Sequence, residues 1–306
     1  MKILRVLKNI HHAAGYVRKC AVCILVTTEA GKKCEPDAKF HPVLCLHGWA
    51  DNCGTFNTLI PKECRYVALD MAGQGRSSHR RPGDFYSLPA YVADVHRVAF
   101  KNFSIIGHSM GEYTIKFTAL YPEMVNALVL LYAYGFLLTD LTEIPKVMRQ
   151  GMDEMLQFEQ KREQINRVYT YETAVERLLA ANSSLSERSV HILLERGLVE
   201  VEGEVAIEFL TGLLNKILEI KCTLNIFKIY FFRSDQGFSR SFYESAQKTF
   251  TSALLLCFQG INVMLTVQGD HHIHLNNPEV VAPFVSDFLR TKLLLQLHEQ
   301  KHKLPA

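Results

Sequence analysis

The sequence predicts an α/β fold with a mostly parallel central sheet and a helical cap insertion. Short apolar runs alternate with helical patterns up to about residue 136, no strong strand pattern appears from about 137 to 215, and strand patterns resume after residue 225. Strands that alternate with helices in this way are typical of parallel sheets whose strands are joined by helical crossovers.

The strands of the first half are predicted from four short apolar runs bounded by turn residues. Continuous runs of this length are typical of strands buried on both faces of a sheet. The runs are residues 43–46, 66–69, 103–106 and 128–131. Apolar residues at helical spacing predict helices between these strands, over 88–100 and 113–121.

The middle of the chain is predicted to be helical, and the last third returns to the sheet. Helices are expected over about 141–166, 171–181 and 186–196; the last begins after Ser184 or Ser186 and ends at Gly197, because serine favours helix starts and glycine favours helix ends. Strands are expected over 226–232 and 263–267, with a closing helix over 278–294. The chain then divides into a leader (1–30), a core (31–136 and 222–294), a cap insertion (137–221) and a tail (295–306).

Composition excludes several classes of protein. The 306 residues are 48% hydrophobic and 21% charged, which is ordinary for a globular chain. The net charge of +3 is too small to argue for nucleic-acid binding, and no apolar run approaches the ~18 residues of a membrane span. Residues 1–33 hold seven Lys or Arg and one acid, as a transit peptide can, but they contain no serine. Because transit peptides are usually rich in serine, mitochondrial targeting by this segment is not favoured.

The chemical signal lies in Gly107-His108-Ser109-Met110-Gly111, which follows a predicted strand and opens a predicted helix. Flanking glycines let the chain turn sharply with a strained serine at the apex, as in a nucleophile elbow. A serine hydroxyl is a weak nucleophile until a base removes its proton. Ser109 is therefore the candidate nucleophile.

His271 and Asp235 are the candidate base and acid. His271 follows the predicted strand 263–267, and Asp235 follows the strand 226–232. Ends of parallel strands lie on one edge of a sheet, so we expect the two side chains to converge with Ser109. The chain order Ser109, Asp235, His271 is the nucleophile–acid–base order of an α/β-hydrolase, in which the acid orients the base.

An oxyanion that develops during acyl transfer needs two N–H donors. The backbone of Met110, directly after the nucleophile, is expected to supply one. The other is expected from Trp49, in the His47-Gly48-Trp49 turn after the first core strand. We expect no metal, because His271, His272 and His274 have no matching ligand set at metal-binding spacing.

Four segments together resemble the α/β-hydrolase superfamily: residues 47–49, 70–77, 107–111 and 269–278. More narrowly, the chain resembles the serine hydrolase-like proteins, through residues 46–52, 120–125 and 269–275. This resemblance implies a serine nucleophile, no cofactor, a small ester or similar acyl substrate, and a location in the cytoplasm or around peroxisomes.

Three positions depart from the family pattern. The family usually has histidine where this chain has Gln74, a second glycine where it has Glu112, and an aspartate after the fourth strand where it has Tyr132. If the acid belongs after the fourth strand, it is missing here. The sequence therefore leaves two functions open: an esterase-like serine hydrolase, and a catalytically impaired pseudo-hydrolase that binds a small ligand.

Overall fold

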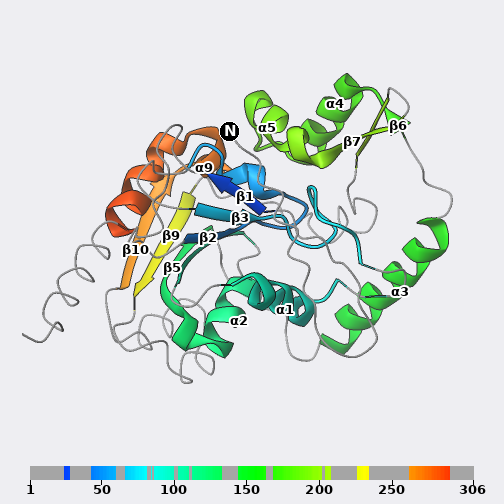
Figure 1. Ribbon diagram of the computed structural model, residues 1–306. Helices are drawn as coiled ribbons and strands as arrows, with labels where there is room; N and C mark the ends of the chain where they lie inside the picture. Colours follow the sequence, from blue (N-terminus) through cyan, green and yellow to red (C-terminus); the bar gives the residue numbers. More distant parts are fainter. Residues whose placement is uncertain are drawn as a thin grey trace, which may run out of the picture.

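The computed structural model describes residues 24–27, 43–59, 66–80, 84, 86–99, 103–109, 112–132, 144–162, 168–201, 204–207, 226–233 and 262–289. Its centre is a seven-stranded sheet in the order β1-β3-β2-β4-β5-β9-β10 (Figure 1). The strands are β1 (Ile24–Thr27), β2 (Val43–Leu46), β3 (Tyr66–Leu69), β4 (Phe103–His108), β5 (Val125–Leu131), β9 (Ile226–Arg233) and β10 (Asn262–Gln268).

The middle of the sheet is parallel, as the sequence predicts. β3 pairs with β2, β2 with β4, and β4 with β5, all in the parallel sense. β1 pairs antiparallel with β3 at the edge. Every described residue of β2, β3 and β4 is buried, because helices cover both faces of the sheet.

β9 runs against the predicted direction. It pairs antiparallel with both β5 and β10, so that β10 runs in the direction of β5. Leu131, at the end of β5, lies opposite Ile229, whereas Arg233 lies opposite Ala127 near the start of β5. The last residue of β10 therefore lies at the same end of the sheet as the last residue of β5, and the last residue of β9 lies at the other end of the strands.

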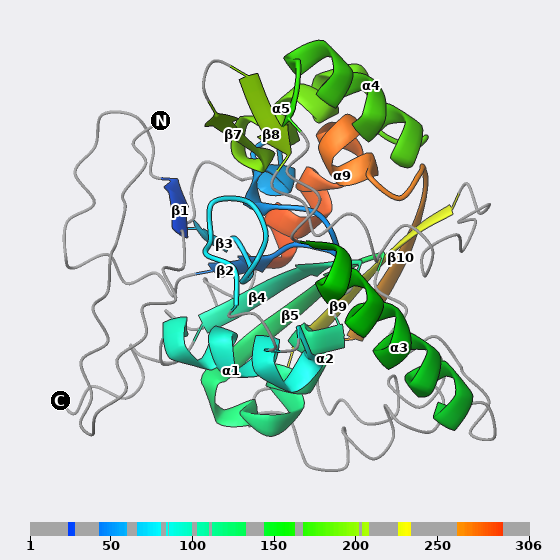
Figure 2. The same cartoon turned by 90° about the vertical axis from the view of Figure 1, so that its right-hand side faces the viewer.

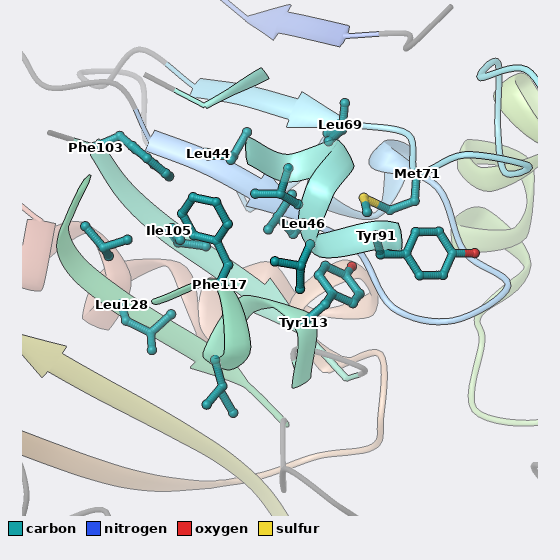
Figure 3. Close-up of a cluster of buried hydrophobic side chains, with 14 of the residues drawn as sticks. Leu44, Leu46, Leu69, Met71, Tyr91, Phe103, Ile105, Tyr113, Phe117 and Leu128 are labelled. Atoms are coloured by element: carbon teal, nitrogen blue, oxygen red, sulfur yellow. The ribbon is translucent and has the colours of Figure 1, made fainter. Parts of the chain in front are cut away.

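Two layers cover the sheet. α1 (Leu88–Val98) and α2 (Glu112–Leu120) pack on one face, where Phe103 meets Phe117 with ring centroids 5.8 Å apart (Figure 3). The other face packs against η1 (Cys53–Phe56), α9 (Ile273–Asn276), η3 (Pro278–Val280) and the helical residues 282–289. The predicted closing helix thus begins with a short 3₁₀ turn, and its residues 290–294 lie outside the described ranges.

The stretch between β5 and β9, of which residues 144–207 are called the cap below, contains three helices where the sequence predicts them: α3 (Ile144–Arg162), α4 (Tyr171–Ala181) and α5 (Glu187–Gly197). A short 3₁₀ helix, η2 (Pro122–Met124), precedes β5. The sequence shows no strong strand pattern here, but the segment also contains a small antiparallel sheet, formed by β6 (Val168–Tyr169), β8 (Glu204–Ile207) and β7 (Leu198–Val201). Strands of two to four residues are too short to show a period that distinguishes them from loops. None of the helices in the described ranges has the length and apolar character to cross a membrane.

Candidate active site

Ser109 occupies a sharp turn between β4 and α2. Its φ of 54° lies in the left-handed region, which residues other than glycine rarely adopt. Its backbone N–H donates to the carbonyl of Leu131 at 3.0 Å, which ties the turn to the end of β5. A Cβ at Gly107 would lie 2.6 Å from Thr114 Oγ1, so only glycine fits between strand and helix there. The turn thus has the strained backbone and close packing expected of a nucleophile elbow.

The turn after β2 lies against this serine. A Cβ on Gly48 would be 2.9 Å from Ser109 Cβ and 3.5 Å from its Oγ. The absence of a side chain therefore lets the backbone approach the reacting atom. The N–H of Trp49 donates to no described residue and is available to an oxyanion. Met110, the other predicted donor, lies outside the described residues.

Buried polar contacts hold this turn in place. Met71 N–H donates to His47 Nε2 at 3.0 Å. Since an N–H can only donate, His47 carries its proton on Nδ1, which donates to the carbonyl of Gly48 at 2.7 Å. The Tyr113 hydroxyl donates to the carbonyl of His47. His47 therefore orients the backbone beside Ser109, a role that requires a neutral ring in one tautomer.

His271 lies in the turn after β10 and contacts His108, the neighbour of Ser109 in the chain. His108 Nε2 donates to the carbonyl of His271 at 3.0 Å, and His108 directly precedes Ser109. The rings of His108 and His271 are 4.8 Å apart. Within the described residues no direct hydrogen bond joins Ser109 to His271; catalytic hydrogen bonds often tighten only when substrate binds. Candidate nucleophile and candidate base are thus brought to one place.

The environment of His271 keeps its ring neutral. Burial, together with the neighbouring rings of His108 and His272, lowers the pKa of His271 well below its usual 6.5, and Asp51 opposes this shift. Its Nδ1 is buried and has no hydrogen-bond partner among the described residues. The ring can accept a proton, and no described carboxylate bonds to the buried nitrogen.

Tyr132 occupies the position where the family pattern places an acid. It is buried, follows β5 directly and has φ 51°. Its ring meets that of His271 edge to face, with centroids 4.6 Å apart. Position 132 therefore does border the base, and this chain puts an aromatic ring where a carboxylate would bind the imidazole.

The prediction for Asp235 loses its structural basis. It assumed that the strand before Asp235 runs parallel to its neighbours, but β9 is antiparallel to β5. Ser109 follows β4, which is parallel to β5, so β9 ends at the other end of the strands, away from Ser109. Asp235 itself lies outside the described residues.

Gln74 and Glu112 are the other two departures from the family pattern, and the structure describes only the side chain of Gln74. The side-chain amide of Gln74 donates to the hydroxyl of Tyr91 at 3.3 Å, and Gln74 is buried in the turn after β3. Burial raises the pKa of Tyr91 to about 12, so this hydroxyl stays protonated. Glu112 is the first residue of α2, and its side chain is not among those described.

Sequence reasoning missed the residues that attach the cap to the core. The buried Arg196 on α5 donates to Asp70 Oδ2 from Nε at 3.2 Å and from Nη2 at 2.5 Å. Asp70 is fully buried after β3 and also accepts the backbone N–H groups of Cys53 and Arg76, at 2.8 and 2.9 Å. An arginine within an amphipathic helix gave no signal, because arginines at such positions usually face water.

The histidines at 271, 272 and 274 make ring contacts and hydrogen bonds with their neighbours. The rings of His108 and His274 are 4.1 Å apart, and those of His271 and His272 are 4.9 Å apart. His272 Nδ1 forms a hydrogen bond with Ser184 Oγ at 2.9 Å, and His274 Nε2 forms one with Thr55 Oγ1 at 3.0 Å. In the part of the chain that the structure describes, no three His, Cys, Asp or Glu side chains are arranged to hold an ion.

Comparisons with known proteins agree with this architecture. A family model described as the alpha/beta hydrolase fold matches residues 41–180. A solved hypothetical protein from Pseudomonas aeruginosa is similar, with a TM-score of 0.59 at 24% identity over 89% of this chain and 98% of that chain.

Two curated relatives carry the narrower assignment. "Serine hydrolase-like protein" of Danio rerio is 45% identical over 81% of this chain and 81% of its own length. "Serine hydrolase-like protein 2" of Homo sapiens is 33% identical over 83% of this chain and 88% of its own length. With the strained Ser109 turn, the adjoining His271 and the shared fold, these similarities show that the chain belongs to the serine hydrolase-like family of α/β-hydrolases.

Proposed function

We propose that this protein is a serine hydrolase that cleaves an ester or a similar small acyl bond. The observation that carries the proposal is the position of Ser109, strained at the turn after β4, with Gly48 against its side chain and His271 linked to it through His108. The partly exposed serine can be reached by a substrate, and the neutral imidazole can take its proton.

In the proposed reaction Ser109 Oγ attacks the acyl carbon while His271 takes the hydroxyl proton. The N–H groups of Trp49 and Met110 stabilise the oxyanion. Collapse of the intermediate breaks the bond to the leaving alcohol, which receives the proton from His271. Water then attacks the acyl-enzyme by the same route in reverse and regenerates Ser109.

The alternative is a pseudo-hydrolase that binds a small ligand without turning it over. Tyr132 favours it, because the phenol borders His271 where a carboxylate would stabilise the imidazolium. The loss of a triad acid lowers kcat by about 10⁴ in a serine protease. The two candidates therefore differ in rate rather than in architecture.

Labelling with a fluorophosphonate tests the proposal. Such a probe forms a bond from Ser109 Oγ to phosphorus and releases fluoride, so it needs an activated serine but no knowledge of the substrate. We expect the folded protein to be labelled and Ser109→Ala to be unlabelled, with intact-mass spectrometry as the readout. A folded wild-type protein that stays unlabelled would contradict the hydrolase proposal and favour the pseudo-hydrolase.

The pH dependence of labelling gives a second prediction. A general base works only when it is unprotonated, and the pKa of His271 lies well below 6.5. We therefore expect the labelling rate to stay level as the pH falls from neutrality through 6.5, with the acid limb at lower pH. A half-maximal rate at pH 6.5 or above would contradict this, because it would indicate an ordinary, solvated histidine.

A further inference from the structure

Asn276 lies at the junction between the cap and the turn that carries His271. Its side-chain amide donates to the carbonyl of Ser184 at 2.7 Å. Its carbonyl oxygen accepts from Ser186 N–H at 3.0 Å and from Ser189 Oγ at 2.7 Å. Ser186 is the N-cap of α5, so this one side chain binds the start of a cap helix. Figure 2 shows α9, which ends at Asn276, beside α5.

The same amide also binds the turn itself. Asn276 Nδ2 lies 3.2 Å and 3.1 Å from the two carboxylate oxygens of Asp270. Asp270 Oδ1 in turn accepts the backbone N–H of His272 at 2.8 Å. Asp270 and His272 flank His271, and His108 holds the His271 carbonyl from the other side. The backbone of the candidate base is thus bound on both sides.

The orientation of this amide is determined by its partners. The Ser186 N–H can only donate and the Ser184 carbonyl can only accept, so Oδ1 must face the former and Nδ2 the latter. Aspartate at 276 would have no donor for Ser184 or Asp270. No other residue type of the same size supplies both two acceptor sites and two donors in this geometry.

From these contacts we infer that Asn276 is a positioning residue, through which α5 of the cap holds Asp270 and the turn bearing His271 in reactive geometry. The inference rests on the proposed function. A second contact acts in parallel, since Ser184 Oγ lies 2.9 Å from Nδ1 of the neighbouring His272. The rate at which Ser109 reacts therefore depends on the contacts that Ser184, Ser186 and Ser189 make with the 270–276 turn.

A charge-swapped pair of variants tests this inference. Asn276→Asp puts two carboxylates against each other, and we expect the limiting labelling rate of Ser109 to fall about 10- to 100-fold, as misplaced catalytic groups do. In the double variant Asp270→Asn with Asn276→Asp, the amide and the carboxylate exchange places. The carboxylate at 276 can then accept from Ser186, Ser189 and the new amide at 270, so we expect part of the rate to return, while the Ser184 carbonyl stays without its donor.

The readout is the fluorophosphonate labelling rate as a function of probe concentration, which separates the limiting rate from the apparent affinity. A positioning role lowers the limiting rate and leaves the affinity unchanged. The control is Arg76→Ala, which removes another bond between core and α5, from Arg76 Nη2 to the carbonyl of Glu195 at 2.8 Å, but does not touch the 270–276 turn. We expect this variant to label at the wild-type rate.

The outcomes separate the two proposals. A wild type that labels while Asn276→Asp labels equally fast, or a swapped variant that labels no faster than Asn276→Asp, overturns the role of Asn276 alone. An unlabelled wild type overturns the proposed function and this inference with it. If Asn276→Asp does not fold, Asn276→Ser takes its place, and an unchanged limiting rate in that variant overturns the inference.

Discussion

Replacing Tyr132 with aspartate is expected to raise the rate at which Ser109 reacts with a fluorophosphonate by about 10²-fold, with a ceiling near the ~10⁴-fold that a triad acid contributes in a serine protease. Position 132 borders the ring of His271, and the buried Nδ1 of that ring has no partner among the described residues. A carboxylate there can accept a hydrogen bond from the Nδ1–H of His271 and stabilise the imidazolium that forms during attack.

The backbone tolerates this change. Tyr132 has φ 51°, and aspartate and asparagine occupy the left-handed region more readily than tyrosine does. The matched control is therefore Tyr132→Asn, which has the same shape and backbone preference but no charge. The new carboxylate also raises the pKa of His271, so the acid limb of the labelling profile moves to higher pH.

Charge is isolated by comparing these two variants. A rate gain in Tyr132→Asp but not in Tyr132→Asn assigns the effect to the carboxylate. Equal rates in the two variants would show that position 132 does not govern the base. In that case the aromatic ring would be a packing residue, and its departure from the family pattern would carry no cost in rate.

Replacing Arg196 with methionine is expected to lower the free energy of unfolding by about 3–5 kcal/mol, the usual cost of leaving one partner of a buried ion pair alone. Arg196 is 4% exposed and Asp70 is 0% exposed. Methionine keeps much of the side-chain volume, so the loss comes from the uncompensated carboxylate rather than from a cavity. The midpoint of urea unfolding measures it.

The double variant Asp70→Asn with Arg196→Met separates charge from packing. We expect it to be more stable than Arg196→Met, because neither charge is then buried alone. Arg76→Ala again serves as the control, since its exposed guanidinium makes a single bond to α5 and is expected to cost ~0.5 kcal/mol or less. A loss under about 1 kcal/mol in Arg196→Met would show that the pair contributes little to docking the cap.

Several parts of the molecule could be predicted from local sequence because local physics decides them. The apolar runs in β2, β3 and β4 had to be strands buried on both faces, and they are. The turn at Ser109 was predictable from the glycines at 107 and 111 on either side of it, and in the structure Gly107 has no room for a Cβ. His271 was predicted at the same end of the sheet as Ser109, and it follows β10, which runs in the direction of β5.

The sequence by itself therefore determined the parallel centre of the sheet, the helices of the cap, and the positions of Ser109 and His271 at the ends of strands. Only the tertiary structure decided the direction of β9, and that direction removes the basis for Asp235. It also decided the edge-to-face contact of Tyr132 with His271 and the attachment of α5 through Arg196 and Asn276. A buried strand has the same composition in either direction, and a polar side chain shows nothing of a partner far away in the chain. Direction and partnership depend on which distant segments fold together, and local periodicity carries no information about that.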